Sequence, residues 1–434
     1  MGRALERRDY GFVFVLGLIY MFNFIDRTII SVVGEAIRRD LGLSDLQLGL
    51  MGGLAFSFFY GLMGIPLARL AERFNRVKII ACVTALWSLM TMLSGAAGSF
   101  VQLLFCRMGV GIGEAGFTPA LVSMISDRFP PEKRALIFSL IAVGVPLGGA
   151  LAAIIGGAVA QALGWRTALI AVGLPGIALA LLLYMTVREP QRANNEVAPP
   201  LIAVLRHLRR SPAFLHLTFG SGMVGLVGFG LNLFLIPLLV RRHGLSLSEA
   251  GFAFALSFSL ATAIGTIIGG VLAARLGQRD IRWYGWAPAL LLCAALPLYL
   301  AAIYQSDWRW LMTLLFVATA CLYAFLPTIM TVTQALVEPR MRASAAAIHS
   351  FGQTVLGLGL GSVLLGYLSD RFATANYGAG YANMCRSGPA IVQSSACQEA
   401  SASGLQQAMM TIAAFLGLAI VNYLLAARAL QQQK

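Results

Sequence analysis

The sequence predicts an all-α membrane protein with twelve transmembrane helices in two six-helix bundles related by pseudo-two-fold symmetry. Three observations lead to this fold class. Of the 434 residues, 58% are hydrophobic and only 12% are charged, whereas soluble domains carry about 25% charged residues. The apolar residues gather in twelve runs, each long enough to cross a bilayer. The loops of the second half of the chain also repeat the spacing of loops in the first half.

The twelve apolar runs are separated by short charged turns, and each is predicted to be one transmembrane helix. They lie at 10–34, 47–67, 77–98, 100–126, 135–160, 166–187, 213–241, 249–274, 283–304, 308–337, 343–368 and 405–430.

The polar stretch after the sixth run divides the chain. Residues 1–190 are predicted to form an N-terminal six-helix bundle, 191–212 a cytoplasmic linker, and 213–434 a C-terminal six-helix bundle. Within the linker, the segment LIAVLRHLRR has the pattern of a short amphipathic helix that lies on a membrane surface.

The distribution of Lys and Arg predicts the orientation of the chain. These residues fall mostly in the segments that face the cytoplasm if both termini lie there, as the positive-inside rule requires. We therefore expect an integral protein of the bacterial inner membrane with both termini in the cytoplasm. The net charge of +14 does not indicate a nucleic-acid partner, because the basic residues are spread along the chain instead of forming one patch.

The sequence lacks the usual signatures of enzymes, motors and metal sites. It has no GxxxxGK[ST] phosphate loop, no CxxC and no HExxH, so we expect no cofactor and no metal. An intramembrane enzyme would need a nucleophile with a His or a metal inside the spans, and His349 is the only His deep in one and has no acid near it in sequence. We therefore predict that the protein is not an enzyme. A non-transporting receptor or scaffold is disfavoured by the charged residues of the first and fourth runs.

Two cysteines, Cys385 and Cys397, share a polar loop that the topology places outside, where a disulfide can persist. The sequence leaves open whether they form one. The other four cysteines fall within apolar runs and are interpreted as small core residues.

The first run carries an acid and a base in the segment NFIDR, residues 23–27. Asp26 lies about 25 Å along a helix that begins at Asp9, within a hydrocarbon core about 30 Å thick. A charge at that depth costs at least about 2.5–3.5 kcal/mol. We therefore expect Asp26 and Arg27 to face a cavity or a partner on a transport path. A structural ion pair that only locks helices together stays open as the alternative.

The fourth run carries a second acid and base in RMGVGIGEAGFTPA, residues 107–120. Arg107 and Glu114 are two helical turns apart and so lie on one face of the helix. We predict that Asp26 and Glu114 carry protons, and that Arg27, Arg107 and Asn23 bind the substrate or pair with the acids. For Glu114, helix locking is the competing interpretation.

The loop after the second run reads ARLAERFNR, and the loop after the eighth reads GVLAARLGQR with the same L-A-x-R core. PPEKRA after the fourth run and EPRMRA after the tenth share a second spacing, which indicates a six-plus-six duplication with the substrate path between the halves. An acid at a helix end pairs favourably with Arg and with neighbouring helix termini. We therefore predict a cytoplasmic latch formed by Glu72, Arg73, Arg76 and Asp127.

The fifth run carries GVPLGGA, residues 144–150. Small residues let helix backbones approach closely, and a proline lets a helix bend. We therefore assign Gly144, Pro146, Gly148 and Gly149 to helix packing and, secondarily, to gating.

These motifs resemble those of the major facilitator superfamily. ARLAERFNR is similar to its GxLxDRxxR loop motif, although Ala68 replaces the first Gly and Glu72 replaces the Asp. Within the superfamily, N-x-x-D-R in the first run, RxGxGxGEA in the fourth and the FPPEKR loop most resemble the spinster family of lipid transporters. The resemblance covers the whole first half and weakens in the second. It implies proton-linked movement of sphingoid or lysophospholipid-type amphiphiles.

The resulting prediction is a secondary active transporter that works by alternating access and, as the resemblance implies, is coupled to protons. Burial favours a protonated carboxyl and a nearby Arg favours an ionised one, so a change of partners changes proton affinity. The alternative is a transporter of the same superfamily that moves small organic anions or drugs. The expected partners are the amphiphilic substrate, protons and membrane lipids, and the chain is expected to act as a monomer.

Overall fold

The computed structural model describes residues 7–192, 201–338, 341–378, 380–385 and 394–432, and within these ranges the regular structure is entirely helical. The α-helices are α1 (Arg7–Leu41), α2 (Asp45–Gly49), α3 (Ala55–Arg73), α4 (Arg76–Gly95), α5 (Phe100–Ala115), α6 (Phe117–Arg128), α7 (Pro131–Ala142), α8 (Gly144–Thr186), α9 (Leu201–Arg209), α10 (Pro212–His243), α11 (Leu247–Phe254), α12 (Ala261–Gly277), α13 (Trp283–Tyr304), α14 (Trp308–Tyr323), α15 (Leu326–Ala335), α16 (Arg342–Gln353), α17 (Gly361–Tyr377), α18 (Tyr381–Cys385), α19 (Ser395–Ala414) and α20 (Leu416–Gln432). Three π-helical segments continue α2, α11 and α16, namely η1 (Leu50–Leu54), η2 (Ala255–Leu260) and η4 (Thr354–Leu360).

Eleven continuous helical stretches of the described residues are long and apolar enough to cross a membrane. One of them, Glu132–Thr186, has 55 residues and would be about 80 Å long if straight. Gly164 breaks it with φ +85°, a conformation that favours glycine, and so separates two crossings. With this division the stretches match the twelve predicted runs, and the all-α membrane fold class is confirmed.

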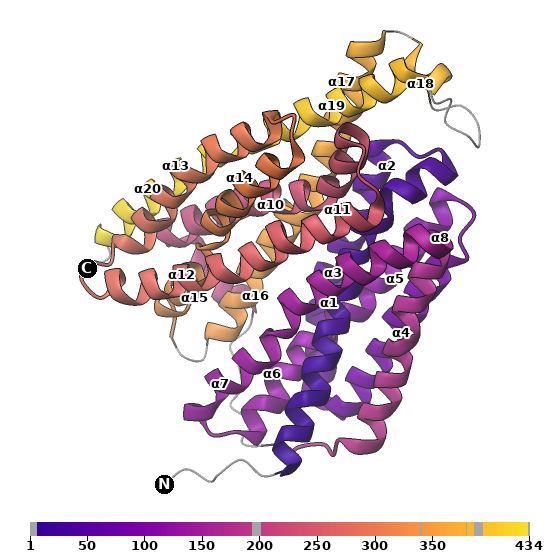
Figure 1. Ribbon diagram of the computed structural model, residues 1–434. Coiled ribbons are helices and arrows are strands. Elements are labelled where there is room, and N and C mark those ends of the chain that lie inside the picture. The colour runs from indigo at the N-terminus through magenta and orange to yellow at the C-terminus, as the bar shows by residue number, and fades with distance from the viewer. Residues whose placement is uncertain (1–6, 193–200, 339–340, 379, 386–393, 433–434) are drawn as a thin grey trace. The chain divides into compact units, whose positions relative to one another are not determined.

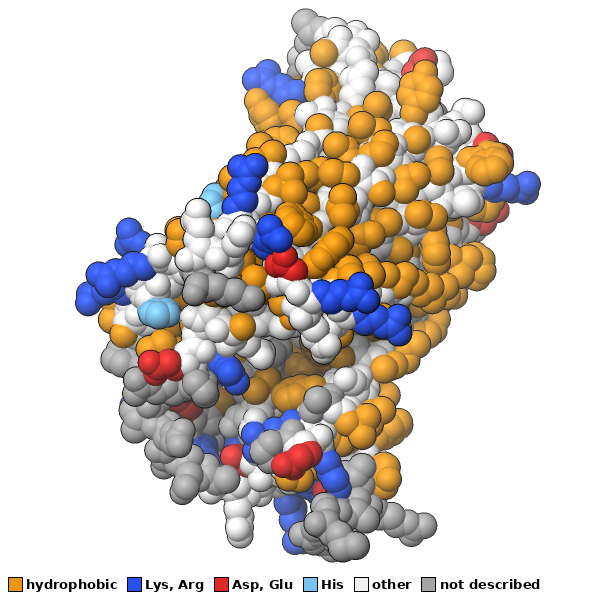
Figure 2. Space-filling view, turned by 90° about the vertical axis from the view of Figure 1, so that its left-hand side faces the viewer, with side chains coloured by type: hydrophobic (Ala, Val, Ile, Leu, Met, Phe, Trp, Pro, Cys, Tyr) orange, Lys and Arg blue, Asp and Glu red, His pale blue; other side chains and the backbone are white. Residues whose placement is uncertain are grey.

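The outer surface of these helices is strongly apolar. Large hydrophobic side chains remain exposed along them, including Phe105 at 66%, Leu163 at 65% and Met185 at 73%. Figure 2 shows broad areas of hydrophobic side chains on the visible face, with Lys, Arg, Asp and Glu in separate groups at their margins. An apolar surface of this extent is stable in contact with lipid and not with water.

Of the interruptions in the described membrane helices, three share one cause. Helix α5 ends at Ala115, α7 at Ala142 and α14 at Tyr323. In each case a proline stands four residues later, at Pro119, Pro146 and Pro327. Proline has no N–H to bond the carbonyl of the fourth residue before it. The α5 break therefore lies at Gly116, two residues after Glu114, and the α7 break comes just before the predicted packing glycines.

The contacts among the described residues divide the chain into two compact units. Unit 1 comprises Met1–Ile37, Ala55–Asn195 and Ser246–Phe252, and unit 2 comprises Arg38–Leu54, Glu196–Leu245 and Ala253–Lys434. Two short segments, 38–54 and 246–252, thus group with a different unit from their neighbours in the chain.

Unit 1 is a bundle in which α4 packs along α8 and α5, and α5 packs along α3. In Figure 1 these helices run beside α1 in indigo to magenta. Buried aromatic rings fill its interior: Trp87 of α4 meets Phe117 of α6 edge to face with the ring centroids 6.0 Å apart.

In unit 2, α10 packs along α20, α13 along α14, and α17 along α19. The predicted linker helix forms as α9, although residues 193–200 before it lie outside the described residues. Val204 and Leu208 of α9 are fully buried in a cluster with Phe214 and Ala345, whereas Ile202 and Leu205 of the same helix are exposed. Protein side chains, rather than lipid, cover Val204 and Leu208.

The sequence left open whether Cys385 and Cys397 are paired. They form a disulfide, and their Cα atoms are 5.6 Å apart. Both cysteines are buried in a small cluster with Tyr381, Ala373 and Ala400. The disulfide therefore fixes α18 to the start of α19.

Candidate functional site

The four ionisable residues predicted from the first and fourth runs lie in unit 1 on two helices. Asp26 and Arg27 come from α1, and Arg107 and Glu114 from α5. Asp26 is 2% exposed, Arg107 and Glu114 are 1% exposed each, and the Arg27 side chain is 27% exposed. Their formal charges sum to zero, and buried charges are tolerated when they compensate one another in this way. We refer to these four residues as the charged quartet.

Arg27 holds the most contacts of the quartet. Its Nε donates to Glu114 Oε2 at 2.5 Å. The guanidinium also lies over three rings, 5.2 Å from the centroid of Phe24, 5.1 Å from Phe56 and 4.8 Å from Tyr60. Cation–π contacts of this kind stabilise a guanidinium most where water is excluded. Arg27 is thus held both by an ion pair and by an aromatic cage.

Asp26 and Arg107 are less completely paired. Arg107 interacts electrostatically with Asp26 and Glu114 and lies 5.7 Å from the Phe56 ring centroid. Within the described residues, however, Arg107 Nε and Nη1 and Asp26 Oδ1 have no hydrogen-bond partner. Buried polar atoms normally have one. Arg107 can therefore accept an anionic group of a substrate, and Asp26 can accept a proton.

Asn23 is 1% exposed and lies one helical turn before Asp26. Its side chain faces the carboxyl of Glu114. The structure thus brings all five predicted charge-site residues together: Arg27 bonds Glu114 directly, and Asn23, Asp26 and Arg107 lie near that pair.

Glycines on α5 bring the neighbouring helices close to the quartet. A Cβ at Gly111 would lie 2.5 Å from the carbonyl oxygen of Phe56, and one at Gly113 would lie 2.9 Å from Cβ of Trp87. Real Cβ atoms do not approach so closely, so glycine is required at both positions. These contacts place Phe56 of α3 and Trp87 of α4 beside the face that carries Arg107 and Glu114.

Two of the predicted packing glycines of the fifth run face α1. A Cβ at Gly144 would lie 2.9 Å from the carbonyl oxygen of Gly17, and one at Gly148 would collide with the carbonyl of Met21 and lie 3.1 Å from Cβ of Phe24. Gly149 is buried as well. Pro146 lies in the first turn of α8, where its missing N–H costs no helical hydrogen bond.

Replacing Gly148 with alanine is expected to destabilise the protein by about 1–3 kcal/mol, because the added methyl meets the backbone of α1 and not a side chain that can move. The midpoint of thermal unfolding in detergent measures the effect. Gly64→Ala is the matched control, since nothing lies within 4 Å of a Cβ there. A helical Gly→Ala change without a clash stabilises by about 0.5–1 kcal/mol. Equal midpoints for the two variants would contradict the close approach of α8 to α1.

The predicted cytoplasmic latch is built around Arg76. Its guanidinium pairs with Asp127, donates through Nε to Glu189 Oε1 at 2.6 Å and through Nη1 to Ser123 Oγ at 2.8 Å. Glu189 also accepts from the backbone N–H of Val77 at 3.0 Å.

The other two predicted latch residues, Glu72 and Arg73, are exposed at the end of α3 and are not part of this cluster. Glu189 was missed by the sequence analysis. The available sequence signal was its position as the first acid after the sixth run.

Unit 2 contains a second buried ionic cluster that the sequence analysis missed. Asp45 accepts two hydrogen bonds of 2.7 Å from Arg241 and one of 2.6 Å from Ser369. Asp370 in turn accepts from the backbone N–H groups of Asp45 and Leu46 at 3.1 and 3.0 Å. The start of α2 is therefore fixed to α10 and α17 by charge-assisted hydrogen bonds.

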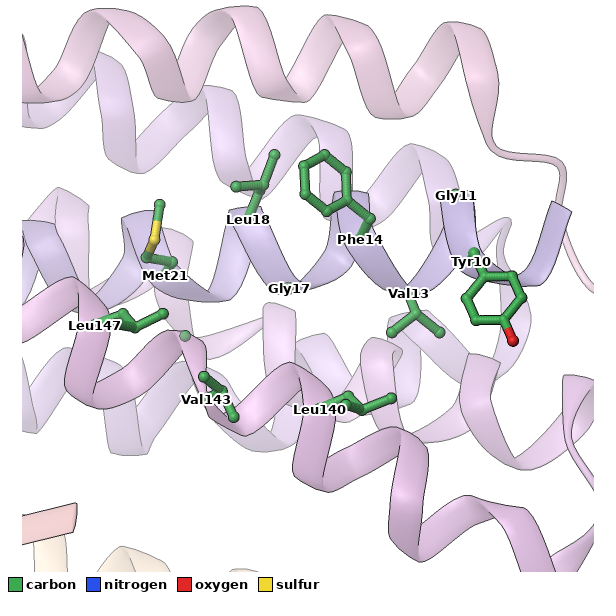
Figure 3. A pocket seen from close by; sticks show the side chains of 11 residues that line it. Tyr10, Gly11, Val13, Phe14, Gly17, Leu18, Met21, Leu140, Val143 and Leu147 are labelled. Carbon is green, nitrogen blue, oxygen red and sulfur yellow. The ribbon is translucent and has the colours of Figure 1, made fainter. Parts of the chain in front are cut away.

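An apolar groove of about 600 Å³ runs along α1 in unit 1. Figure 3 shows Val13 of α1 pointing toward Leu140 of α7, with Val143 and with Leu147 of α8 on the same side of α1. The groove also contains Tyr10, Gly11, Phe14, Gly17, Leu18 and Gly144. Positions 10, 14, 17 and 21 form one stripe of the helix, and the same spacing continues to Phe24, the ring that Arg27 covers.

Comparison with known proteins gives consistent results. The sequence profile of the Major Facilitator Superfamily matches residues 16–362. An MFS-type efflux pump of Mycolicibacterium smegmatis is 36% identical over 366 residues, which are 84% of this chain and 85% of that protein. Human protein spinster homolog 1 is 28% identical over 396 residues, which are 83% of this chain and 72% of that protein.

Among solved structures, a bacterial homologue of the human lysosomal transporter Spinster, in an inward-facing and unoccupied conformation, is similar with a TM-score of 0.88. It is 34% identical in sequence, and the match covers 99% of both chains. The chain is therefore a transporter of the major facilitator superfamily and belongs within it to the spinster family.

Proposed function

We propose that the protein is a proton-coupled secondary transporter that moves a lysophospholipid or sphingoid-type amphiphile across the bacterial inner membrane by alternating access. The observation that carries the proposal is the charged quartet: two acids and two arginines buried together in a unit whose other buried residues are largely apolar. Ionisable residues inside a membrane domain are costly, and they are retained where they move ions or bind substrate.

The proposed proton carriers are Asp26 and Glu114. Glu114 is paired with Arg27, whereas Asp26 has a carboxyl oxygen without a partner among the described residues. When an anionic substrate group binds Arg107, the attraction between Arg107 and Asp26 weakens. Asp26 then takes up a proton, because an isolated buried carboxyl is stable only in its neutral form.

The groove along α1 supports an amphiphilic substrate. The groove offers hydrocarbon contact on the same stripe of α1 as Phe24. In this proposal the headgroup binds near Arg27 and Arg107, and the apolar tail binds beside α1, both within unit 1. In addition, the six apolar runs of the second half have no Asp, Glu, Lys or Arg well inside them. A polar substrate such as a sugar would need hydrogen-bonding groups all around it.

The second candidate function is transport of small organic anions or drugs. The donors of Arg107 that have no partner in the described part of the chain suit any anion, and one of the relatives is named as an efflux pump. The two candidates differ in whether the apolar tail contributes to binding.

The discriminating experiment is uptake into proteoliposomes of a radiolabelled lysophospholipid and, separately, of a short carboxylate, each with and without an imposed pH gradient. We expect the gradient to drive net movement of the lysophospholipid only. Gradient-driven movement of the carboxylate alone would reject the amphiphile and favour the second candidate. Absence of any pH effect on either compound would reject proton coupling.

The same proposal includes the topology and the assembly state. Both termini are placed in the cytoplasm on the basis of the Lys and Arg distribution, and the chain is proposed to act as a monomer. Substituted cysteines at the two ends of the chain, labelled from one side of intact cells, test the orientation.

A further inference from the structure

We propose that Phe56 is a positioning residue of the charged quartet. Its ring attracts the guanidinium of Arg107, keeps it off Glu114, and so leaves its donors open to an anionic group of the substrate. The proposal rests on the proposed function for the role of Arg107 as the group that binds this anion. Phe56 lies at the start of α3, inside unit 1, and is 1% exposed.

The ring of Phe56 lies beside both arginines of the quartet. The Cζ atoms of Arg27 and Arg107 are 5.1 and 5.7 Å from its centroid. At such distances the electron-rich face of a ring attracts a cation, and most strongly where water is excluded. Arg27 also lies over Phe24 and Tyr60, whereas Phe56 is the only ring over Arg107 in the described part of the chain. Loss of the ring would therefore affect Arg107 more than Arg27.

Arg107 does not use the acceptor that Glu114 offers. Among the described residues, Arg107 Nε and Nη1, Glu114 Oε1 and Asp26 Oδ1 all lack a hydrogen-bond partner. A charge-assisted hydrogen bond between such groups is strong, so a guanidinium that moved freely would form one. The charge of Glu114 is already balanced by Arg27, and a second arginine therefore gains less from it. A buried cation–π contact is then large enough to decide where Arg107 lies.

The backbone of α5 fixes Phe56 from one side. Gly111 follows Arg107 by four residues and precedes Glu114 by three, so all three share one face of α5. A Cβ at Gly111 would lie 2.5 Å from the carbonyl oxygen of Phe56 and 3.3 Å from its Cα. From α3, Tyr60 stacks on Phe56 with the ring centroids 5.5 Å apart and an angle of 22° between the planes. The ring is therefore fixed beside the face that carries both Arg107 and Glu114.

The test replaces Phe56 with phenylalanine residues that carry one, two or three fluorine atoms on the ring. Fluorine withdraws electrons from the ring face and weakens its attraction for a cation, while the shape of the side chain stays nearly the same. Isothermal titration calorimetry in nanodiscs measures the Kd of hexyl phosphate, a small amphiphilic anion. We expect the Kd to rise with each fluorine and to be about tenfold higher with three, since a buried cation–π contact is of that size.

Phe117 is the matched control. It is also 1% exposed and belongs to unit 1, and its ring meets those of Tyr20 and Trp87. Among the described residues, the arginines of the quartet lie over other rings and not over Phe117. The same fluorine series at Phe117 should leave the Kd unchanged. A Kd that stays constant along the series at Phe56, or that rises equally at Phe117, would overturn the proposal.

A second measurement needs no ligand. Trifluorophenylalanine in place of Phe56 should lower the midpoint of thermal unfolding. The decrease should be smaller in Arg107→Met, because one of the cations that the ring attracts is then absent. An equal decrease with and without Arg107 would contradict the contact between ring and guanidinium. If hexyl phosphate does not bind the unchanged protein, the anion-binding role of Arg107 in the proposed function is wrong, and this thermal cycle alone decides whether Phe56 holds Arg107.

Discussion

Replacing Asp26 with asparagine is expected to abolish substrate accumulation driven by a pH gradient while leaving substrate exchange intact. Asparagine keeps the size of the side chain but cannot carry a proton. A gradient of one pH unit stores about 1.4 kcal/mol per proton, which corresponds to about tenfold accumulation at one proton per substrate. In proteoliposomes the accumulation ratio should therefore fall from about ten to about one.

Two measurements make this result specific. Counterflow, in which labelled substrate exchanges for unlabelled substrate without a pH gradient, should proceed in Asp26→Asn at a rate similar to that of the unchanged protein. Glu132→Gln is the matched acid-to-amide control, because Glu132 is exposed at the start of α7, and it should retain the tenfold accumulation. Full gradient-driven accumulation in Asp26→Asn would remove this residue from the coupling mechanism.

Replacing Arg76 with glutamine is expected to cause the largest loss of stability. The Arg76 side chain is 1% exposed, and it neutralises two acids, Asp127 and Glu189. Removing one partner of a buried ion pair costs about 3–5 kcal/mol, and the lower end, about 3 kcal/mol, applies here because the two acids are partly exposed. The midpoint of thermal unfolding in detergent should fall by several degrees.

The control for this variant is Arg73→Gln, three residues earlier. Arg73 is exposed and lies outside the Arg76 cluster, and surface substitutions of this type usually change stability by less than about 0.5 kcal/mol. If Arg73→Gln lowered the midpoint as much as Arg76→Gln, the effect would come from basic charge in the loop in general and not from the buried cluster.

The fold could be predicted from the sequence because a bilayer leaves few alternatives. Backbone groups must be satisfied within a helix when no water is present, so each long apolar run has one outcome. The same constraint made Asp26 and Glu114 conspicuous, since each is an acid in the middle of an apolar run. Their grouping with Arg27 and Arg107 followed from charge compensation, and the two-turn spacing of Arg107 and Glu114 placed them on one face.

The residues that the sequence did not indicate act through tertiary contacts. Phe56 and Tyr60 belong to the apolar pattern of the second run, and nothing in that pattern distinguishes a ring over Arg27 from a ring facing lipid. Glu189 and Arg241 looked like ordinary helix-end charges, because their partners Arg76 and Asp45 are 113 and 196 residues away in the chain. Glu72, by contrast, matched a motif position and is exposed, since the motif does not specify which acid reaches Arg76.

The central claim is that the charged quartet converts a proton gradient into substrate movement. The most direct test records proton and lysophospholipid fluxes simultaneously in one proteoliposome sample, for the unchanged protein and for the double variant Asp26→Asn/Glu114→Gln. Proton flux that rises in fixed proportion to substrate flux in the unchanged protein, and is lost in the double variant, is the predicted result. Substrate flux without proton flux in the unchanged protein, or coupled flux that persists in the double variant, would contradict the claim.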